Sequence, residues 1–254
     1  MNAARTYTLP GFDGAALAVH EVGDEHARPV MLIHGLFSNA ETNWIKYGHA
    51  AQLAEAGFRV IMPDLRAHGL SAAPHDPAAY PEGVLSKDII ALIEALQLED
   101  YDLGGFSLGA RTVAALISQD AVRPRQALIA GMGLEGLSAW SQRRNFFIEA
   151  IDKRETIKRD DPHFMAVMFM KTMKIDPVAA RLLLEAGNRV DIDALCASDI
   201  PAAIICGVDD QDNGSAKALA DALADTLYYE IPGTHMSCIT RPELGQAMVD
   251  FLKA

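Results

Sequence analysis

Short apolar runs alternate along most of the chain with segments in which apolar residues recur every three or four positions. Continuous apolar runs are typical of strands buried on both faces, and the second pattern predicts amphipathic helices. The predicted strands cover residues 6–9, 15–22, 30–33, 59–62, a stretch that ends at Leu103, 127–130, 202–206 and 227–231. The predicted helices cover residues 44–56, 85–96, the stretch after Ser107, 215–224 and 242–252.

This alternation implies right-handed crossovers and an α/β fold, with a doubly wound, mostly parallel sheet. The first two strands flank a Gly-containing turn and predict an antiparallel hairpin. From about residue 134 to 197 the strand pattern is missing, and helical periodicity and charge dominate. We therefore expect a core formed by residues 1–133 and 198–254, interrupted by a helical cap over residues 134–197.

Composition narrows the class of protein. The 254 residues include 22 Lys and Arg against 34 Asp and Glu, a net charge of −12, so we expect no nucleic-acid partner. The sequence contains neither an 18-residue apolar run nor an N-terminal signal pattern, and we expect a cytoplasmic protein without membrane contact. Cys196, Cys206 and Cys238 are too few and too irregular for a disulfide framework or zinc site. We predict no metal and no cofactor, and the oligomeric state is not indicated.

Ser107 is the candidate nucleophile. It lies in Gly105-Phe106-Ser107-Leu108-Gly109, where a predicted strand meets a predicted helix. A sharp turn at this point would hold the hydroxyl clear of the sheet, and the two glycines would relieve crowding around it. The alternative is that Ser107 only caps the helix, a position that serine favours.

A neutral serine hydroxyl needs a base. Among the eight histidines we favour His235, in a loop after the last strand, because loops that leave parallel strands share the edge where Ser107 lies. A surface histidine without a role is the alternative. The base in turn needs an acid that orients the imidazole. Asp209, Asp210 and Asp212 follow a predicted strand on the same edge, and spacing alone does not decide among them.

Four motifs together resemble the α/β-hydrolase fold family. They are Ile33-His34-Gly35, the stretch from Pro63 to Ser71 (PDLRAHGLS), the Gly105–Gly109 elbow, and Gly207-x-x-Asp210 followed by Gly233-x-His235. The resemblance implies the triad order Ser107, Asp210, His235 and favours Asp210, which stands three residues after its glycine. It also implies that the backbone N–H groups of Leu36 and Leu108 form the oxyanion hole. His34, Asp64, Arg66 and His68 are then expected to hold loop geometry.

The resemblance implies a serine hydrolase that cleaves a carboxylic ester of a small or medium hydrophobic substrate through an acyl-enzyme. The same triad could act on a lactone, thioester, peracid or carbon–carbon bond, although carbon–carbon hydrolases often carry tryptophan where Met236 stands. Epoxide hydrolases and haloalkane dehalogenases resemble the sequence but use aspartate in place of Ser107. A non-catalytic small-molecule receptor of the same fold is the third alternative.

The cap supplies candidates for the substrate pocket. We expect one apolar helical face formed by Phe164, Met165, Met168, Phe169 and Met173, which either packs on the core or forms the pocket ceiling. The basic pairs at 143–144, 153–154 and 158–159 are interpreted as a solvated helix face. The predicted pocket residues are Phe37, Phe106, Met165, Met168, Phe169 and Met236.

Overall fold

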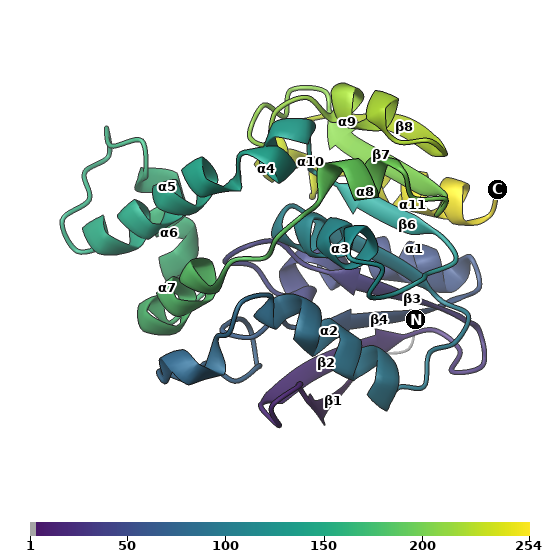
Figure 1. The fold of residues 1–254 in the computed structure, drawn as a ribbon, viewed down its shortest axis with the longest axis horizontal. Coiled ribbons are helices and arrows are strands. Elements are labelled where there is room, and N and C mark those ends of the chain that lie inside the picture. Colours follow the sequence, from purple (N-terminus) through teal and green to yellow (C-terminus); the bar gives the residue numbers. More distant parts are fainter. Residues whose placement is uncertain (1–3) are drawn as a thin grey trace.

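The computed structural model describes residues 4–254. Eight strands form one sheet in the order β1-β2-β4-β3-β5-β6-β7-β8, in which β1 and β2 pair antiparallel and all strands from β4 to β8 run parallel (Figure 1). The strands are β1 (Arg5–Pro10), β2 (Ala16–Val22), β3 (Arg28–Ile33), β4 (Phe58–Pro63), β5 (Asp102–Phe106), β6 (Ala127–Ala130), β7 (Ala202–Gly207) and β8 (Thr226–Ile231). The predicted α/β fold with a mostly parallel sheet is confirmed.

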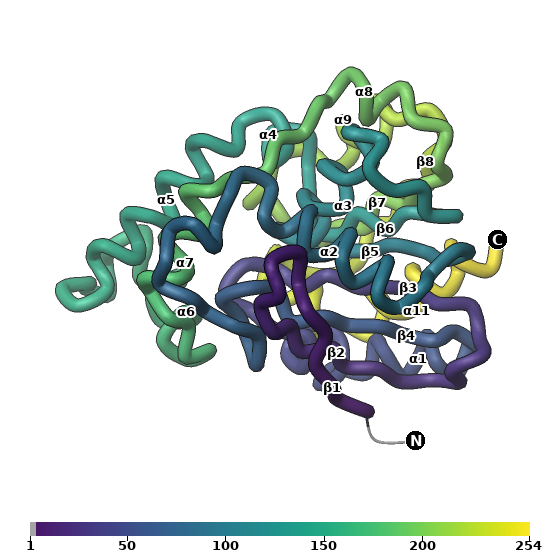
Figure 2. Tube along the Cα trace, turned by 60° about the horizontal axis from the view of Figure 1, so that its bottom comes forward, coloured from purple at the N-terminus to yellow at the C-terminus, as the bar shows by residue number. Residues whose placement is uncertain are grey.

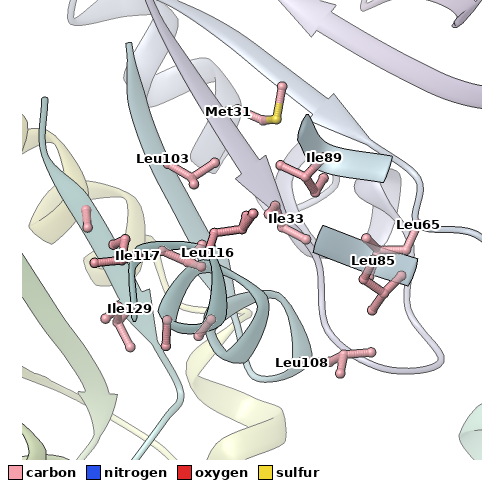
Figure 3. Packing of buried hydrophobic residues seen from close by; sticks show 14 of the residues in the cluster. Met31, Ile33, Leu65, Leu85, Ile89, Leu103, Leu108, Leu116, Ile117 and Ile129 are labelled. Carbon is pink, nitrogen blue, oxygen red and sulfur yellow. The ribbon is translucent and has the colours of Figure 1, made fainter. Parts of the chain in front are cut away.

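Helices cover both faces of the sheet. The core helices are α1 (His49–Glu55), α2 (Val84–Ala95), α3 (Leu108–Ser118), α8 (Ile192–Cys196), α9 (Ala216–Ala222), α10 (His235–Cys238) and α11 (Pro242–Leu252). On one face, α2 and α3 pack on the strands through Ile33, Ile89, Leu103 and Leu116 (Figure 3). On the other face, α1 and α11 pack against each other over a second apolar cluster. Strands with apolar side chains on both faces therefore form the centre of the core.

Two predicted elements have different bounds in the structure. The expected helix over 44–56 is split into a π-helical turn, Glu41–Ile45, and α1, because Gly48 between them adopts φ +86°. Strand β5 does not end at Leu103 but continues through two glycines to Phe106. A Cβ on Gly104 would come within 2.8 Å of Leu32, so the close packing of β5 against β3 requires glycine at this position. Backbone pairing with β3 and β6 holds this part of β5 in the sheet.

Between β6 and β7 the chain is helical: α4 (Leu134–Ser138), α5 (Trp140–Lys153), α6 (Phe164–Thr172), α7 (Pro177–Ala186) and α8. Helices α5, α6 and α7 lie together at one side of the sheet, whereas α8 packs on α3 (Figures 1 and 2). Helices α5, α6 and α7 share a small apolar cluster that includes Ile151, Met170 and Leu184. No helix within residues 4–254 is long and apolar enough to cross a membrane.

For Met165 and Met168, the expected apolar face of the cap helix does not pack on the core. The buried residues of α6 are Val167 and Met170, whereas Met165 is 73% exposed and Met168 is 41% exposed. Seven apolar residues in a row, 164–170, present no clear amphipathic stripe, so periodicity cannot select the buried side. The packing of α6 against α5 selects it instead.

Candidate active site

Ser107 lies in a strained turn between β5 and α3. Its backbone has φ +54° and ψ −110°, a conformation that non-glycine residues seldom adopt and that marks functional turns. The flanking glycines are required by close backbone contacts. A Cβ on Gly105 would come within 2.3 Å of the carbonyl carbon of Gly109, and a Cβ on Gly109 would come within 2.0 Å of the carbonyl oxygen of Ile33. The turn therefore needs glycine two positions before and two positions after the serine.

The structure brings together the three residues expected to form the triad. His235 Nε2 lies 3.1 Å from Ser107 Oγ, and His235 Nδ1 lies 2.8 Å from Asp210 Oδ2. His235 begins the four-residue helix α10 rather than lying in an extended loop, and Thr234 and Ser237 form a capping box at its start. Because Asp210 can only accept when ionised, the proton of the neutral imidazole lies on Nδ1 and Nε2 faces the serine hydroxyl.

Asp210 is buried and accepts three hydrogen bonds. Besides His235, the backbone N–H of Asp212 donates to Oδ1 at 3.0 Å and the Cys206 thiol donates to Oδ2 at 3.5 Å. Burial raises the pKa of Asp210. The hydrogen bond from His235 and the charge of its ring lower that pKa, and together with the other hydrogen bonds they outweigh burial, so the pKa of Asp210 lies below its ordinary value. Asp209 is exposed and Asp212 pairs with Arg143, so of the three candidates Asp210 is the one that contacts His235.

The expected oxyanion donors lie on either side of Ser107. The N–H of Leu108 is the first of helix α3, where no preceding turn can accept it. The N–H of Leu36 belongs to the loop after β3, and no acceptor for it is found within residues 4–254. The side chain of Leu108 packs in the core (Figure 3). That of Leu36 lines the cavities at Ser107.

Two buried histidines hold this loop. His34 Nδ1–H donates to the carbonyl of Gly35 at 2.8 Å, and its Nε2 accepts from Leu65 N–H at 2.9 Å. His68 Nε2 accepts from the N–H of Phe37 at 2.9 Å. Burial lowers the pKa of both histidines, that of His68 to about 3, so both rings are neutral and can accept. Both histidines therefore act on loop geometry, as the family resemblance implies.

Asp64 and Arg66 also hold backbone and side-chain geometry rather than facing Ser107. Asp64 accepts from the N–H groups of Ala40 and Leu70 at 2.8 Å each. Arg66 is fully buried and forms ion pairs with Asp13 at 2.7 Å and Asp88 at 2.8 Å. Both side chains therefore join segments far apart in the sequence.

Two cavities meet at Ser107 and His235. The smaller, of about 120 Å³, lies against the core, and the larger, of about 500 Å³, lies under α5 and α6. All six residues expected in the pocket line one or both: Phe37, Phe106, Met165, Met168, Phe169 and Met236. Sequence reasoning missed further lining residues, among them Thr42, Asn43 and Tyr47 in the smaller cavity and Arg143, Phe146 and Phe147 in the larger.

Arg143 departs from its expected place on a solvated helix face. Its side chain is 24% exposed, lies over the ring of Phe147 at 5.2 Å and forms an ion pair with Asp212 at 3.1 Å. The Phe146-Phe147 pair beside it was the signal for this orientation, because two aromatic residues within a charged helix indicate a buried side. Arg143 thus connects the cap to the loop that carries Asp210.

Sequence comparison places these features in a family. A family model described as alpha/beta hydrolase fold matches residues 28–169, more than half of the chain. The chain is 36% identical over 110 residues to a protein of Caballeronia sordidicola named epoxide hydrolase, and the matched segment covers 42% of this chain and 32% of that protein. It is 37% identical over 93 residues to AB hydrolase superfamily protein YisY of Bacillus subtilis, covering 37% of this chain and 32% of that protein. The chain thus spans about a third of the length of the curated relatives it matches.

Solved structures share the fold across the whole chain. A thermophilic esterase from Thermogutta terrifontis, with malate bound, has a TM-score of 0.76 at 23% identity over 98% of both chains. A hydrolase from Pseudomonas aeruginosa has a TM-score of 0.76 at 21% identity over the full length of both. Identities this low show the fold and no more. The family match over more than half of the chain, together with the sheet order and the Ser107 elbow, shows that this protein belongs to the α/β-hydrolase fold family.

Proposed function

We propose that the protein is a serine hydrolase that cleaves a carboxylic ester of a small or medium hydrophobic substrate. The observation that carries the proposal is the chain of contacts from Ser107 Oγ through His235 to Asp210, at 3.1 Å and 2.8 Å, at the base of two mostly apolar cavities. A buried carboxylate, a neutral imidazole and a serine hydroxyl in this order form the arrangement that activates serine for acyl transfer.

The first half-reaction forms an acyl-enzyme. Ser107 Oγ attacks the ester carbonyl carbon while His235 Nε2 takes the hydroxyl proton, and Asp210 stabilises the imidazolium through Nδ1. The carbonyl oxygen becomes an oxyanion that accepts hydrogen bonds from the N–H groups of Leu36 and Leu108. When this intermediate collapses, the carbon–oxygen bond to the alcohol breaks, and the leaving oxygen takes the proton from His235.

The second half-reaction hydrolyses the acyl-enzyme. His235 Nε2 takes a proton from a water molecule, whose oxygen attacks the acyl carbon. Collapse of the second oxyanion breaks the bond to Ser107 Oγ, which regains its proton from His235, and the carboxylic acid leaves. No group beyond the chain and water is needed to balance either step.

Three relatives are named epoxide hydrolases, but we do not propose epoxide opening for this chain. Epoxide hydrolases of the family use an aspartate where Ser107 stands, and its carboxylate forms an alkyl ester with the opened epoxide. A serine hydroxyl at the elbow suits attack on a carbonyl carbon instead. Lactones, thioesters and carbon–carbon substrates share such a carbonyl and belong in the same substrate panel.

Covalent labelling tests the proposal. A fluorophosphonate should label the native protein at Ser107 and should fail to label Ser107→Ala, whereas Ser141→Ala, on the exposed start of α5, should label normally. Turnover of p-nitrophenyl esters should fall by about 10⁴-fold or more in Ser107→Ala. Absence of both labelling and turnover at micromolar protein would refute the proposal and favour a binding protein of the same fold.

A further inference from the structure

Phe37 occupies a turn position that usually takes glycine. The N–H of Ser38 donates to the carbonyl of Gly35 at 3.2 Å and closes a four-residue turn, in which Phe37 is the third residue. Phe37 has φ +59°, and a turn with positive φ at its third residue favours glycine there, because glycine has no Cβ. Since phenylalanine stands at this position, interactions of its side chain must offset the strain of its backbone.

The side chain of Phe37 finds those interactions in the cap. It is 1% exposed and belongs to the apolar cluster shared by α5, α6 and α7, which we call the cap cluster. The other buried members of the cap cluster are Ile151, Met170, Ile175, Ala180 and Leu184. The rings of Phe37 and Phe147 meet edge to face, with their centroids 5.6 Å apart. Apart from Phe37 and its neighbour Leu36, all described members of the cap cluster lie between residues 140 and 184.

The cap cluster is itself fixed on the core. Helix α7 contributes Ala180 and Leu184 to the cap cluster, and it also contributes Ala179 and Leu183 to the large apolar cluster of the core. None of the buried members of the cap cluster other than Phe37 lines a cavity at Ser107. The cap cluster therefore contacts Phe37 from behind the substrate cavities and does not form their wall.

The backbone of the turn connects Phe37 to the proposed oxyanion donor. The N–H of Phe37 donates to His68 Nε2 at 2.9 Å, so the turn is held on the core side by its backbone and on the cap side by the Phe37 ring. The Gly35–Leu36 peptide carries the Leu36 N–H and lies beside the nucleophile, because a Cβ on Gly35 would come within 3.5 Å of the Cβ of Ser107. Whatever fixes the turn therefore also fixes the direction of this N–H.

We propose, on the basis of the serine hydrolase proposed above, that Phe37 is a positioning residue through which the cap holds the Leu36 N–H in the oxyanion hole. Release of the Phe37 side chain lets the turn relax from its strained φ, and the Gly35–Leu36 peptide rotates with it. The donor then no longer points at the oxyanion, whereas the triad keeps its hydrogen bonds. The cap thus contributes to the rate of acyl transfer in addition to forming the larger cavity.

Two substitutions at Phe37 test the role of its side chain. Phe37→Ala keeps a Cβ, and with it the strain of positive φ, but removes the ring that packs in the cap cluster. We expect it to lower kcat for p-nitrophenyl acetate by about 10- to 100-fold, because full loss of one oxyanion donor costs about 10²–10³-fold. Phe37→Leu keeps a large apolar side chain in the cap cluster and should retain kcat within about threefold of the native value.

Two ketone inhibitors separate the oxyanion hole from the cavity wall that Phe37 also forms. Ser107 Oγ adds to the carbonyl carbon of benzyl trifluoromethyl ketone, its proton passes to His235 Nε2, and the carbonyl oxygen becomes an oxyanion. Benzyl methyl ketone has a similar shape but binds mainly as the free ketone. We expect Phe37→Ala to raise the inhibition constant of the trifluoromethyl ketone by about tenfold or more, and that of the methyl ketone by less than about threefold.

Leu184→Ala tests the proposal from the cap, because Leu184 is buried in α7 and lines neither cavity. The matched control is Leu92→Ala in α2, which removes a buried leucine outside both the cap cluster and the cavities. Urea unfolding should show a loss of stability in both variants. At a temperature where both are folded, only Leu184→Ala should lower kcat, by about threefold or more, with little change in KM.

The outcomes distinguish this inference from the function on which it rests. If folded Phe37→Ala kept kcat within about twofold of the native value, or bound both ketones more weakly by the same factor, Phe37 would only form the cavity wall. Equal kcat values for Leu184→Ala and Leu92→Ala would likewise overturn the inference, and in each case the ester hydrolase would stand. Absence of both fluorophosphonate labelling and ester turnover in the native protein would refute the proposed function and this inference together.

Discussion

His68 offers a test of how the oxyanion loop is positioned. The buried ring accepts the N–H of Phe37 through Nε2 at 2.9 Å and donates from Nδ1 to the carbonyl of Arg66 at 2.9 Å. Phe37 has φ +59°, a conformation that costs about 1–3 kcal/mol and must be held by its surroundings. Its amide adjoins Leu36, so the histidine fixes the direction of the proposed oxyanion donor.

Replacement by leucine removes both hydrogen bonds. In His68→Leu the Phe37 N–H and the Arg66 carbonyl lose their buried partners, at a cost of about 1–3 kcal/mol for each group. We expect the free energy of unfolding to fall by about 2–4 kcal/mol, because partial relaxation of the loop recovers some of this cost. Full loss of one oxyanion donor lowers kcat by about 10²–10³-fold, so a displaced Leu36 N–H should lower it by about 10- to 100-fold.

The assay separates positioning from general destabilisation. Urea unfolding gives the loss of stability, and ester kinetics at a temperature where the variant is fully folded give kcat and KM. We expect kcat to fall with little change in KM, because the oxyanion exists only in the transition state and intermediate. His68→Gln should recover most of kcat, since its amide oxygen can accept the Phe37 N–H in place of Nε2.

Asn188→Ala is the matched control, because it removes a buried hydrogen bond to Ser86 at 3.0 Å that lies outside both active-site cavities. It should lower stability and leave kcat unchanged. If folded His68→Leu retained kcat within twofold of the native value, the proposed link between His68 and the oxyanion donor would be wrong.

Two further predictions follow from buried carboxylates. Asp210→Asn should lower kcat by about 10³–10⁴-fold, because the amide no longer selects the Nδ1–H tautomer of His235. Asp212→Asn should lower kcat less than tenfold. If ester kinetics gave the reverse ranking, Asp212 and not Asp210 would be the acid of the triad. Burial raises the pKa of Asp102 to about 6 despite its ion pair with Arg28 at 2.9 Å. The native state therefore binds the proton of the Asp102 carboxyl group more tightly than the unfolded state does. The protonated group contributes about 3 kcal/mol to the free energy of unfolding, and this contribution is fully present below the unfolded pKa near 4 and is lost as pH rises through about 6. Urea unfolding of Asp102→Asn at pH 4 and pH 7 should show its stability relative to the native protein rising with pH, and a pH-independent difference would contradict the shifted pKa.

Much of the fold could be predicted from sequence because local patterns determine it. Continuous apolar runs predict strands that are buried on both faces. All eight strands of the sheet overlap a predicted stretch, and only the extension of β5 from Leu103 to Phe106 was not expected among the interior strands. The split at Gly48 was missed because the flanking residues keep helical spacing on both sides of it. A single glycine with positive φ leaves no trace in the apolar pattern around it.

The elbow was predictable for a reason that the cap does not share. Gly105 and Gly109 are dictated by backbone atoms at 2.0–2.3 Å from where a Cβ would lie, a steric demand that any sequence forming this turn must meet. Arg143 faces no such demand, and its position in the larger cavity depends on how α5 packs on α6 and on the partner Asp212. Close backbone contacts restrict a position to glycine and so produce a recognisable motif, whereas many different sequences can form the contacts between short helices. It follows that cap substitutions should alter substrate size preference while leaving the geometry of Ser107 and His235 intact, because none of the hydrogen bonds that hold the elbow or the triad comes from α5, α6 or α7 within the described chain.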